Sequence, residues 1–316
     1  MIVTVTLNPA VDEALAIERF ELGGLNRCSI DDLDAGGKGI NASRVIRRLG
    51  RETLALGFLG GATGDLIRAR LNEEGVPHAF DEIDEWTRVN VMLYERANGR
   101  RTRMYLPGAA VPAERLADLR ARLRALPAKS VVVLAGSLPP GSNDTTYRDL
   151  IAALNESGAQ VVLDTSGPAL REARPARPAL VKPNVHEAGE ILGRVLSGDD
   201  DVVRAAFQMR ALGAKSVVIS QGAAGAVGVD EVGCWKAIPP HVPASSTVGS
   251  GDSMVGALAV ALDERLGLAE GLRLGTAAGA ATAMTEGTHL CRMLDVERLL
   301  PDVRVGAIHR SLAPLD

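Results

Sequence analysis

A glycine-rich turn that runs into an apolar helical pattern carries the strongest chemical signal in the sequence. It reads Ser246-Thr-Val-Gly-Ser-Gly-Asp-Ser-Met254. Glycines directly before a helix allow consecutive backbone N–H groups to point at one spot, and the helix N-terminus adds about half a positive charge there. Such a turn holds a phosphate or a developing anion. Asp252 opens the helix, where a carboxylate either caps the backbone or takes a proton from a nucleophile.

Three other turns offer polar groups to a small ligand. The segment Asp34-Ala-Gly-Gly-Lys-Gly-Ile-Asn41 precedes a helix and presents backbone donors and an amide, which suit sugar hydroxyls. Asn184 and Glu187 lie three residues apart at a helix start, close enough to share a face and to hold Mg²⁺ directly or through its waters. Ser220-Gln-Gly-Ala-Ala-Gly225 lets a phosphate or a flat ligand approach the backbone. Each turn alone is at least as typical of an ordinary loop, but together they predict a ligand-binding edge of an α/β sheet.

Several common motifs are excluded. Lys38 is followed by glycine rather than by Ser or Thr, so its turn is not a P-loop. The first strand runs into Leu7-Asn8-Pro9, which is not a dinucleotide-binding fingerprint. Ser137 does not lie in a Gly-x-Ser-x-Gly nucleophile elbow. His289 and Cys291 form an isolated pair that is more typical of packing than of a zinc site.

Apolar strand-like runs alternate with amphipathic helical patterns along the chain, which predicts a mostly parallel sheet covered by helices on both faces. The expected strands are Ile2–Leu7, Thr53–Phe58, Val131–Ala135, Val161–Asp164, Leu180–Lys182 and Val217–Gln221. The expected helices are Ile40–Leu49, Gly64–Glu74, Ala113–Ala125, Thr145–Glu156, His186–Leu192, Val202–Leu212, Asp252–Leu262 and Leu268–Met284. We expect Ser197–Asp201 and the Pro-rich Arg171–Leu180 to be surface loops.

Two extended, more polar segments break this rhythm, at about residues 12–34 and 86–107. The second contains a hairpin signal, Asn98-Gly99, between alternating runs. We interpret both as strands of a small second sheet that projects from the main body and covers a cleft as a lid. On pattern alone, surface hairpins without a role fit equally well. We expect residues 1–316 to form a single domain.

The composition is that of a soluble globular protein, because 46% of the 316 residues are hydrophobic and 23% are charged. The net charge of −4 and the lack of a dense basic block argue against nucleic-acid binding. No apolar run approaches about 18 residues, so we expect no membrane-spanning helix. The first residues read as a strand rather than as a signal peptide, and Cys28, Cys234 and Cys291 are too few for a disulfide framework. A cytoplasmic setting fits best.

Taken in order, the motifs resemble those of the PfkB (ribokinase-like) family of carbohydrate kinases. The resemblance extends from Thr6 to about Cys291, and its motifs are Asn8-Pro9 with Asp12, Gly36–Asn41, Gly136–Gly141, Lys182-Pro-Asn-x-x-Glu187 and Thr247–Ser253. The chain resembles the phosphosugar branch of 6-phosphofructokinases of the minor bacterial isozyme type, 1-phosphofructokinases and tagatose-6-phosphate kinases. The segments that look most like the first group are Trp86–Asn90, Pro107–Ala110 and Glu286–Cys291. Lys38 is more usual in the other two groups, and His289 stands where an arginine is expected.

The resemblance implies a three-layer α/β sandwich with a mostly parallel central sheet and a small β-sheet lid. It implies ATP- and Mg²⁺-dependent phosphorylation of a ketohexose monophosphate, with fructose 6-phosphate as the leading substrate. Fructose 1-phosphate and tagatose 6-phosphate are alternatives, and a non-catalytic sugar-phosphate-binding regulator is a further one. The resemblance also implies a homodimer whose lid strands pair between subunits, and a K⁺ ion near the nucleotide.

The resemblance assigns a role to each motif. Asp252 would be the catalytic base, beside an anion hole formed by Gly249, Ser250 and Gly251. The residues implied for the sugar hydroxyls are Asp12, Gly36, Gly37 and Asn41, and those for its phosphate are Arg88, Ser137 and Arg27. The residues implied for ATP are Lys182, Asn184, Ser220, Gly222, Gly225, Thr247 and Gly279, and those for Mg²⁺ are Asn184 and Glu187. The residues implied for K⁺ are Ser246, Val248, Thr282, Thr285, Gly287 and His289.

Overall fold

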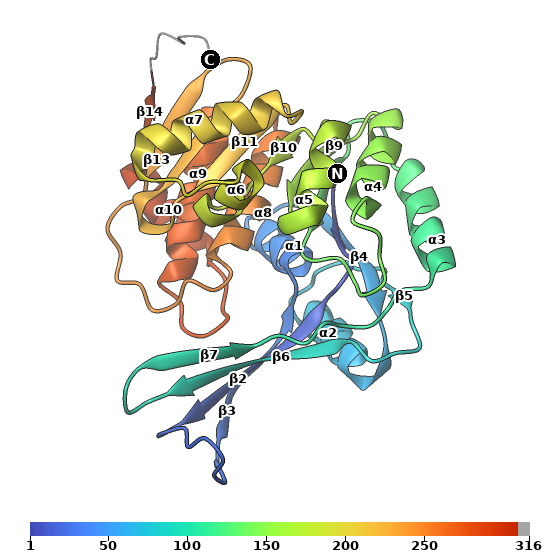
Figure 1. The fold of residues 1–316 in the computed structure, drawn as a ribbon, viewed down its shortest axis with the longest axis vertical. Coiled ribbons are helices and arrows are strands. Elements are labelled where there is room, and N and C mark those ends of the chain that lie inside the picture. The colour runs from blue at the N-terminus through green and yellow to red at the C-terminus, as the bar shows by residue number, and fades with distance from the viewer. Residues whose placement is uncertain (309–316) are drawn as a thin grey trace.

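A large mixed sheet forms the centre of the computed structural model, which describes residues 1–308 (Figure 1). Its strand order is β14-β13-β12-β11-β10-β9-β8-β1-β4-β5. The strands from β11 to β5 pair in parallel, and β12, β13 and β14 add an antiparallel edge. Their bounds are β1 Ile2–Thr6, β4 Thr53–Leu59, β5 Asp81–Glu82, β8 Val131–Ala135, β9 Gln160–Asp164, β10 Leu180–Val181, β11 Ser216–Ser220, β12 Ala226–Val229, β13 Cys234–Ile238 and β14 Arg304–Ala307.

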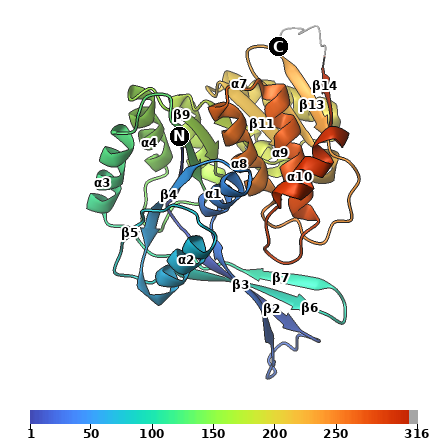
Figure 2. The same cartoon turned by 180° about the vertical axis from the view of Figure 1, so that it is seen from behind.

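Helices cover both faces of this sheet, because its central strands are apolar on both sides. Val132 and Leu134 of β8 pack into one buried cluster with α3 to α7, whereas Val131 and Val133 pack into another with α1, α8, α9 and α10. Figures 1 and 2 show the two helix layers from opposite sides. The helix bounds are α1 Lys38–Arg48, α2 Gly61–Glu73, α3 Ala113–Arg124, α4 Thr146–Glu156, α5 Gly167–Ala173, α6 Val185–Leu192, α7 Gly198–Ala211, α8 Ser250–Asp263, α9 Leu268–Ala283 and α10 Met293–Leu299. The predicted three-layer fold is confirmed.

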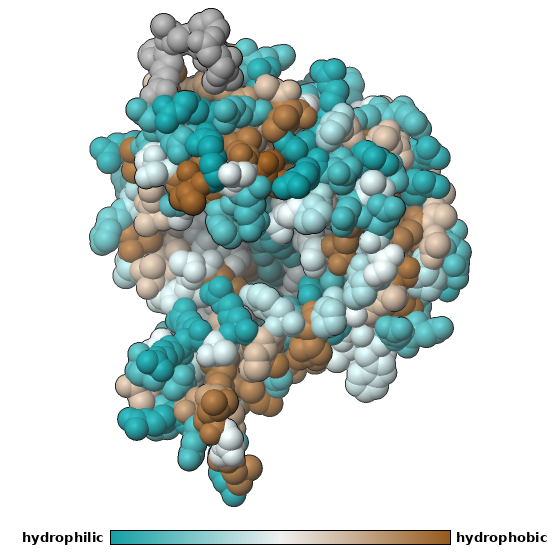
Figure 3. All heavy atoms as spheres, viewed as in Figure 1, coloured by the Kyte–Doolittle hydropathy of each residue, from teal (hydrophilic) through white to brown (hydrophobic). Residues whose placement is uncertain are grey.

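A second, four-stranded sheet projects from the main body, as the two polar segments predict. Its order is β3-β2-β6-β7, with bounds β2 Ala10–Ile17, β3 Ser29–Gly36, β6 Arg88–Glu95 and β7 Arg100–Met104. The predicted hairpin turn joins β6 to β7, where Gly99 has a φ of 70° and donates to the carbonyl of Glu95. A hollow separates this sheet from the main body (Figure 3). The loop between β2 and β3 exposes the apolar side chains of Leu22 and Leu25.

Two predicted loops are wrong. Residues 198–201 form the first turn of α7 rather than a loop, because three successive aspartates there complement the helix dipole. Arg171–Leu180 contains the end of α5 and a short 3₁₀ helix, Arg174–Ala176, with a proline in its first turn. Ala173 is fully buried there and belongs to the core, whereas Arg171, Pro175 and Arg177 are exposed.

Several helices begin earlier than predicted. Their first turns contain glycine and lysine, which are not part of the apolar pattern from which the helices were predicted. Thus α1 begins at Lys38 rather than Ile40, and α2 at Gly61 rather than Gly64. The short elements β5, β12, β13, β14, α5 and α10 escaped the sequence pattern. None of the helices in residues 1–308 is long and apolar enough to span a membrane, and the three cysteines, which all lie in this range, form no disulfide.

Candidate active site

Two cavities meet at the carboxyl ends of the central strands. The lid cavity, of about 410 Å³, lies under the small sheet, and the loop cavity, of about 800 Å³, lies between the starts of α6 and α8, α9 and the segment 239–244. The linings of the two cavities share four residues, which are Lys38, Glu187, Thr247 and Asp252. A ligand in one cavity therefore reaches the same wall as a ligand in the other.

The amino end of α8 forms this shared wall. Gly249 precedes the helix with a φ of 76°, a left-handed conformation that lets the turn present its N–H groups outward. The first-turn N–H groups of a helix have no acceptor within it. That of Ser250 makes a long bond of 3.4 Å to the carbonyl oxygen of Thr247, so those of Gly251 and Asp252 are the ones available to an anion. The ammonium group of Lys182 lies beside this turn. Its Nζ is 3.6 Å from the position that a Cβ on Gly251 would occupy, so it adds positive charge there. These groups suit an anion, and the anion hole stays a prediction.

Asp252 is not the helix cap, because Gly249 holds that position and no side chain caps α8. Its Oδ2 instead accepts a hydrogen bond of 2.8 Å from Nδ2 of Asn41 on α1. Gly256 permits this approach of the two helices, because a Cβ there would lie 2.9 Å from the carbonyl oxygen of Ala42. Burial raises the pKa of Asp252, although Lys38 opposes the shift. The structure thus excludes the helix-cap alternative, and the role of Asp252 as a base stays a prediction.

Lys38 and Asp164 are functional candidates that the sequence did not reveal. Asp164 ends β9, is 1% exposed, and lies between the Nζ atoms of Lys38 at 3.1 Å and Lys182 at 3.5 Å. Burial alone would raise the pKa of Asp164, but the two lysines lower it below its usual value. Asp164, Asp252 and Glu187 likewise raise the pKa of Lys38 against the effect of burial. Lys38 therefore stays charged beside the start of α8. An acidic residue at the end of an apolar strand was the available signal.

Asn184 and Glu187 form a capping box at the start of α6. Oδ1 of Asn184 accepts from the backbone N–H of Glu187 at 2.9 Å, and Oε2 of Glu187 accepts from that of Asn184 at 2.8 Å. The other carboxylate oxygen, Oε1, points towards Lys38, with its Nζ 3.9 Å away. The amide oxygen of Asn184 is thus committed to the helix, whereas Glu187 keeps one oxygen for a ligand.

Asp12 occupies the lid cavity, where its Oδ1 accepts a 2.9 Å hydrogen bond from Nδ2 of Asn90. Gly36 lies directly behind it, since a Cβ there would be 2.1 Å from Oδ2 of Asp12. Gly36 therefore makes room for Asp12 and does not itself line the cavity, whereas Gly37 and Asn41 do. Burial raises the pKa of Asp12 from 3.8 to about 6; the Asn90 bond lowers it, and the charges of Asp252 and Asp34 raise it further.

Arg88 lines the lid cavity and is held by the backbone. Its three guanidinium nitrogens donate to the carbonyl oxygens of Asn8 at 2.9 Å, Pro9 at 3.3 Å and Leu106 at 2.7 Å. Ser137, also predicted for the phosphate, lines the same cavity. Arg27 lies elsewhere, in the exposed loop between β2 and β3, and is absent from the lining of its own chain's cavity within residues 1–308. The structure thus brings together Arg88 and Ser137 but not Arg27.

The residues predicted for a nucleotide line the loop cavity. Gly225 has a φ of 89°, and a Cβ on it would lie 1.9 Å from the carbonyl oxygen of Ala237, so the turn requires glycine. Gly279 lets α9 approach the start of α8, with the carbonyl oxygen of Ser250 3.2 Å from its Cβ position. The predicted residues that line this cavity are Lys182, Asn184, Ser220, Gly222, Gly225, Thr247 and Gly279.

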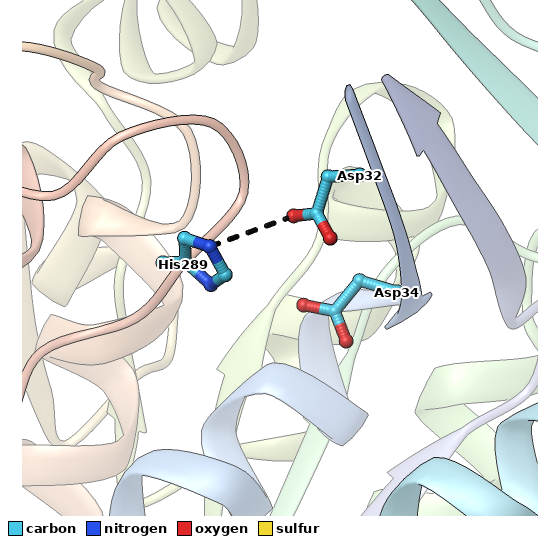
Figure 4. A group of neighbouring side chains, drawn as sticks. All are labelled: Asp32, Asp34 and His289. Carbon is cyan, nitrogen blue, oxygen red and sulfur yellow. Dashed lines mark ion pairs between the residues drawn. The ribbon is translucent and has the colours of Figure 1, made fainter. Parts of the chain in front are cut away.

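The residues predicted for K⁺ lie in two adjoining segments, because the N–H of Ser246 donates to the carbonyl of Ala283. The hydroxyl of Thr285 lies 2.7 Å from the carbonyl oxygen of Thr282 and 2.5 Å from that of His289. The His289 ring faces Asp32 and Asp34 of the small sheet (Figure 4). Its Nε2 lies 3.9 Å from Asp32. Ser246, Val248 and Gly287 complete the two segments.

Comparison with known proteins agrees with this arrangement. Residues 5–294 match the pfkB family of carbohydrate kinases. The chain is 38% identical to the ATP-dependent 6-phosphofructokinase isozyme 2 of Escherichia coli (strain K12), across 94% of this chain and 97% of that protein. It is also 38% identical to the 1-phosphofructokinase of Bacillus subtilis (strain 168), across 96% and 99%. The crystal structure of Escherichia coli phosphofructokinase-2 in complex with potassium matches with a TM-score of 0.91 at 38% identity, across 95% of this chain and 98% of that one. This chain therefore belongs to the pfkB family of carbohydrate kinases.

Proposed function

We propose that the protein transfers the γ-phosphoryl group of ATP to the C1 hydroxyl of fructose 6-phosphate and forms fructose 1,6-bisphosphate. The observation that carries this proposal is the meeting of the two cavities at Asp252 and the amino end of α8. A sugar in the lid cavity and a nucleotide in the loop cavity would present a hydroxyl and a terminal phosphate to the same groups. Phosphoryl transfer needs little beyond such positioning and charge neutralisation.

Asp252 acts as the base in this proposal. The hydroxyl proton passes to its Oδ1 while Asn41 holds Oδ2, the sugar oxygen bonds to the γ-phosphorus, and the bond to the β–γ bridging oxygen breaks to release ADP. Burial raises the pKa of Asp252, which makes it a stronger base than an exposed carboxylate. The first-turn N–H groups of α8, with Lys38 and Lys182, neutralise the charge of the transferring group. One such preorganised donor contributes about 3–4 kcal/mol to lowering a barrier.

Mg²⁺, when bound, would supply positive charge to the phosphates of ATP. The residues fit this ion, because Oδ2 of Asp164 is buried without a hydrogen-bond partner in residues 1–308 and Oε1 of Glu187 is not used by the capping box. Carboxylate oxygens are the ligands that Mg²⁺ prefers. We therefore assign Asp164 and Glu187 to the ion, and Asn184 to holding Glu187.

The identity of the phosphosugar has one close alternative, fructose 1-phosphate. The equal 38% identity to the 6-phosphofructokinase and the 1-phosphofructokinase supports both, and Lys38 favours the second. A coupled assay of ADP release with fructose 6-phosphate, fructose 1-phosphate and tagatose 6-phosphate decides between them. We expect the highest kcat/KM for fructose 6-phosphate; turnover of fructose 1-phosphate alone would overturn the assignment.

Replacement of the base tests the mechanism itself. We expect Asp252→Asn to lower turnover at least 100-fold, which is the low end for a lost base, while sugar-phosphate binding by calorimetry stays measurable. A non-catalytic regulator would show no turnover in the native protein either, and unchanged turnover in the variant would remove Asp252 from the mechanism.

We also propose that the protein is a homodimer and that it binds K⁺. The exposed Leu22 and Leu25 at the end of the small sheet support a homodimer formed through that sheet, and light scattering at micromolar concentration measures its mass. Carbonyl oxygens beside Thr285 support a K⁺ site next to the nucleotide.

A further inference from the structure

The side chain of His289 faces two carboxylates of the small sheet. Asp32 and Asp34 lie two residues apart on β3, so alternation puts them on one face of that strand. One ligand atom from each of the three side chains lies within 4.8 Å of the other two (Figure 4). The sequence paired His289 with Cys291, but Cys291 is fully buried whereas His289 is exposed. The structure therefore gives this histidine other neighbours, from a distant part of the chain.

The spacing of these atoms fits ligands of one metal ion better than it fits direct contacts. Nε2 of His289 lies 3.9 Å from Oδ2 of Asp32, which is too long for a hydrogen bond. Two ligands bound to one ion at about 2.0–2.2 Å lie about 3–4.4 Å apart, depending on the angle between the bonds. The exposed ring of His289 can close any remaining gap by rotation. Zn²⁺ accepts histidine nitrogen together with carboxylate oxygen, whereas Mg²⁺ and Ca²⁺ prefer oxygen alone.

Hydrogen bonds hold both carboxylates in place from behind. Oδ2 of Asp32 accepts from Oγ1 of Thr288 at 2.8 Å. Oδ2 of Asp34 accepts from Nη2 of Arg44 at 2.9 Å. The backbone N–H of the following residue donates to Oδ1 of each, at 2.9 Å for Asp32 and 2.8 Å for Asp34. Carboxylates that bind metals are oriented by such outer hydrogen bonds, and each oxygen keeps a second lone pair for an ion.

The two carboxylates also leave negative charge that is not compensated. Arg44 is bonded to Asp34, but its Nε also donates to both carboxylate oxygens of Glu74, at 3.0 and 3.1 Å. Within residues 1–308, Asp32 forms no ion pair with a lysine or an arginine. The charge of Asp34 still raises the pKa of Asp12, so Arg44 does not cancel it. A divalent cation would neutralise this charge.

We propose that Asp32, Asp34 and His289 bind a divalent transition-metal ion of the Zn²⁺ type, with water in its remaining positions. The exposure of the side chains rises from 9% in Asp34 to 23% in Asp32 and 61% in His289, so the ion enters from the solvent at the histidine. It joins β3 of the small sheet to the segment between α9 and α10 of the main body, and so fastens the two together. The site is separate from the proposed Mg²⁺ site at Asp164 and Glu187 and from the proposed K⁺ site, which is built from backbone oxygens.

Calorimetric titration of the metal-free protein with Zn²⁺, without nucleotide or sugar, tests the site. We expect one ion per chain with a micromolar Kd and no displacement by excess Mg²⁺ or K⁺, which prefer oxygen ligands. His289→Gln and Asp32→Asn should each raise the Kd of Zn²⁺ at least about 10-fold, because each removes a ligand and the loss of an outer partner alone has an effect of that size. Asn at position 32 keeps an oxygen that accepts from Thr288, so the variant retains this contact.

His186→Gln is the matched control. His186 is also exposed, and its Nε2 lies 3.2 Å from Oε1 of Glu190, in a pair that no third metal-binding side chain joins within residues 1–308. The Kd of Zn²⁺ in this variant should equal that of the native protein. A histidine beside one carboxylate is thereby compared with a histidine beside two.

Thermal unfolding provides a second measurement. Because the ion binds the folded chain, Zn²⁺ should raise the Tm of the native protein and of His186→Gln but not that of His289→Gln. The Tm without metal shows that His289→Gln, which replaces an exposed ring, is folded. Three results would each overturn the inference: no Zn²⁺ binding by the native protein, equal Kd values for the native protein and His289→Gln, or displacement of Zn²⁺ by K⁺. These measurements involve no turnover, so they stand or fall independently of the proposed function.

Discussion

Asp12→Asn should stabilise the fold while it abolishes tight sugar binding. Folding moves the pKa of Asp12 from 3.8 to about 6, chiefly by burial, so the ionised carboxylate costs stability that an amide does not. Asn retains an oxygen that accepts from Nδ2 of Asn90, so the hydrogen bond at 2.9 Å is kept. The substitution therefore removes the charge and little else.

The pH dependence of this gain follows from linkage. A carboxyl whose pKa is raised on folding costs nothing well below its unfolded pKa, costs more as the pH rises from 3.8 to about 6, and costs a constant amount above that. With 1.36 kcal/mol per pKa unit, the cost is about 2 kcal/mol at pH 5 and about 3 kcal/mol at pH 8. Asp12→Asn should be more stable than the native protein by about these amounts.

Urea denaturation of both proteins at several pH values between 5 and 8, without substrate, measures this difference. Titrations of groups that do not interact with Asp12 cancel when the two free energies of unfolding are subtracted. Asp252 and Asp34, whose charges raise the pKa of Asp12, remain coupled to it. We expect the difference to grow by about 1 kcal/mol over this range. A variant that is less stable at pH 8, or a difference that is independent of pH, would refute the reasoning.

Two other substitutions test how the backbone builds the site. Gly36→Ala should raise the KM for the sugar phosphate at least 10-fold with little change in the KM for ATP, because its Cβ would lie 2.1 Å from Oδ2 of Asp12. Gly267→Ala, where nothing lies within 4 Å of the Cβ position, is the control, and equal kinetics of the two variants would contradict the role of Gly36. Asn184→Ala should lower the free energy of unfolding by about 1 kcal/mol through loss of the α6 cap, and an unchanged urea midpoint would show that the capping box contributes nothing.

The sequence predicted the site best where function depends on local backbone geometry. Three predicted turns line the cavities or support them: the turn before Asp252, the glycines before Asn41 and the Gly222–Gly225 turn. They could be predicted because a glycine before a helix is a pattern of only a few neighbouring residues. The buried strands of the central sheet were predicted for a similar reason, since continuous apolar runs identify them.

Contacts between distant segments could not be predicted in this way. Lys38 and Asp164 are separated by 126 residues and meet only because α1 begins at the edge of the sheet where β9 ends. Asn184 and Glu187 were predicted as magnesium ligands from their spacing, yet the same spacing forms a capping box, and only the hydrogen bonds decide between the two. Residues 198–201 were assigned to a loop because an exposed acidic run resembles one, although it suits a helix start equally well.

The wall shared by the two cavities has a thermodynamic consequence. Four residues line both cavities: Lys38, Glu187, Thr247 and Asp252. A ligand that binds in one cavity therefore changes the surroundings of a ligand in the other. Their affinities are then coupled, and the coupling is reciprocal: the factor by which nucleotide changes the dissociation constant of sugar equals the factor by which sugar changes that of nucleotide.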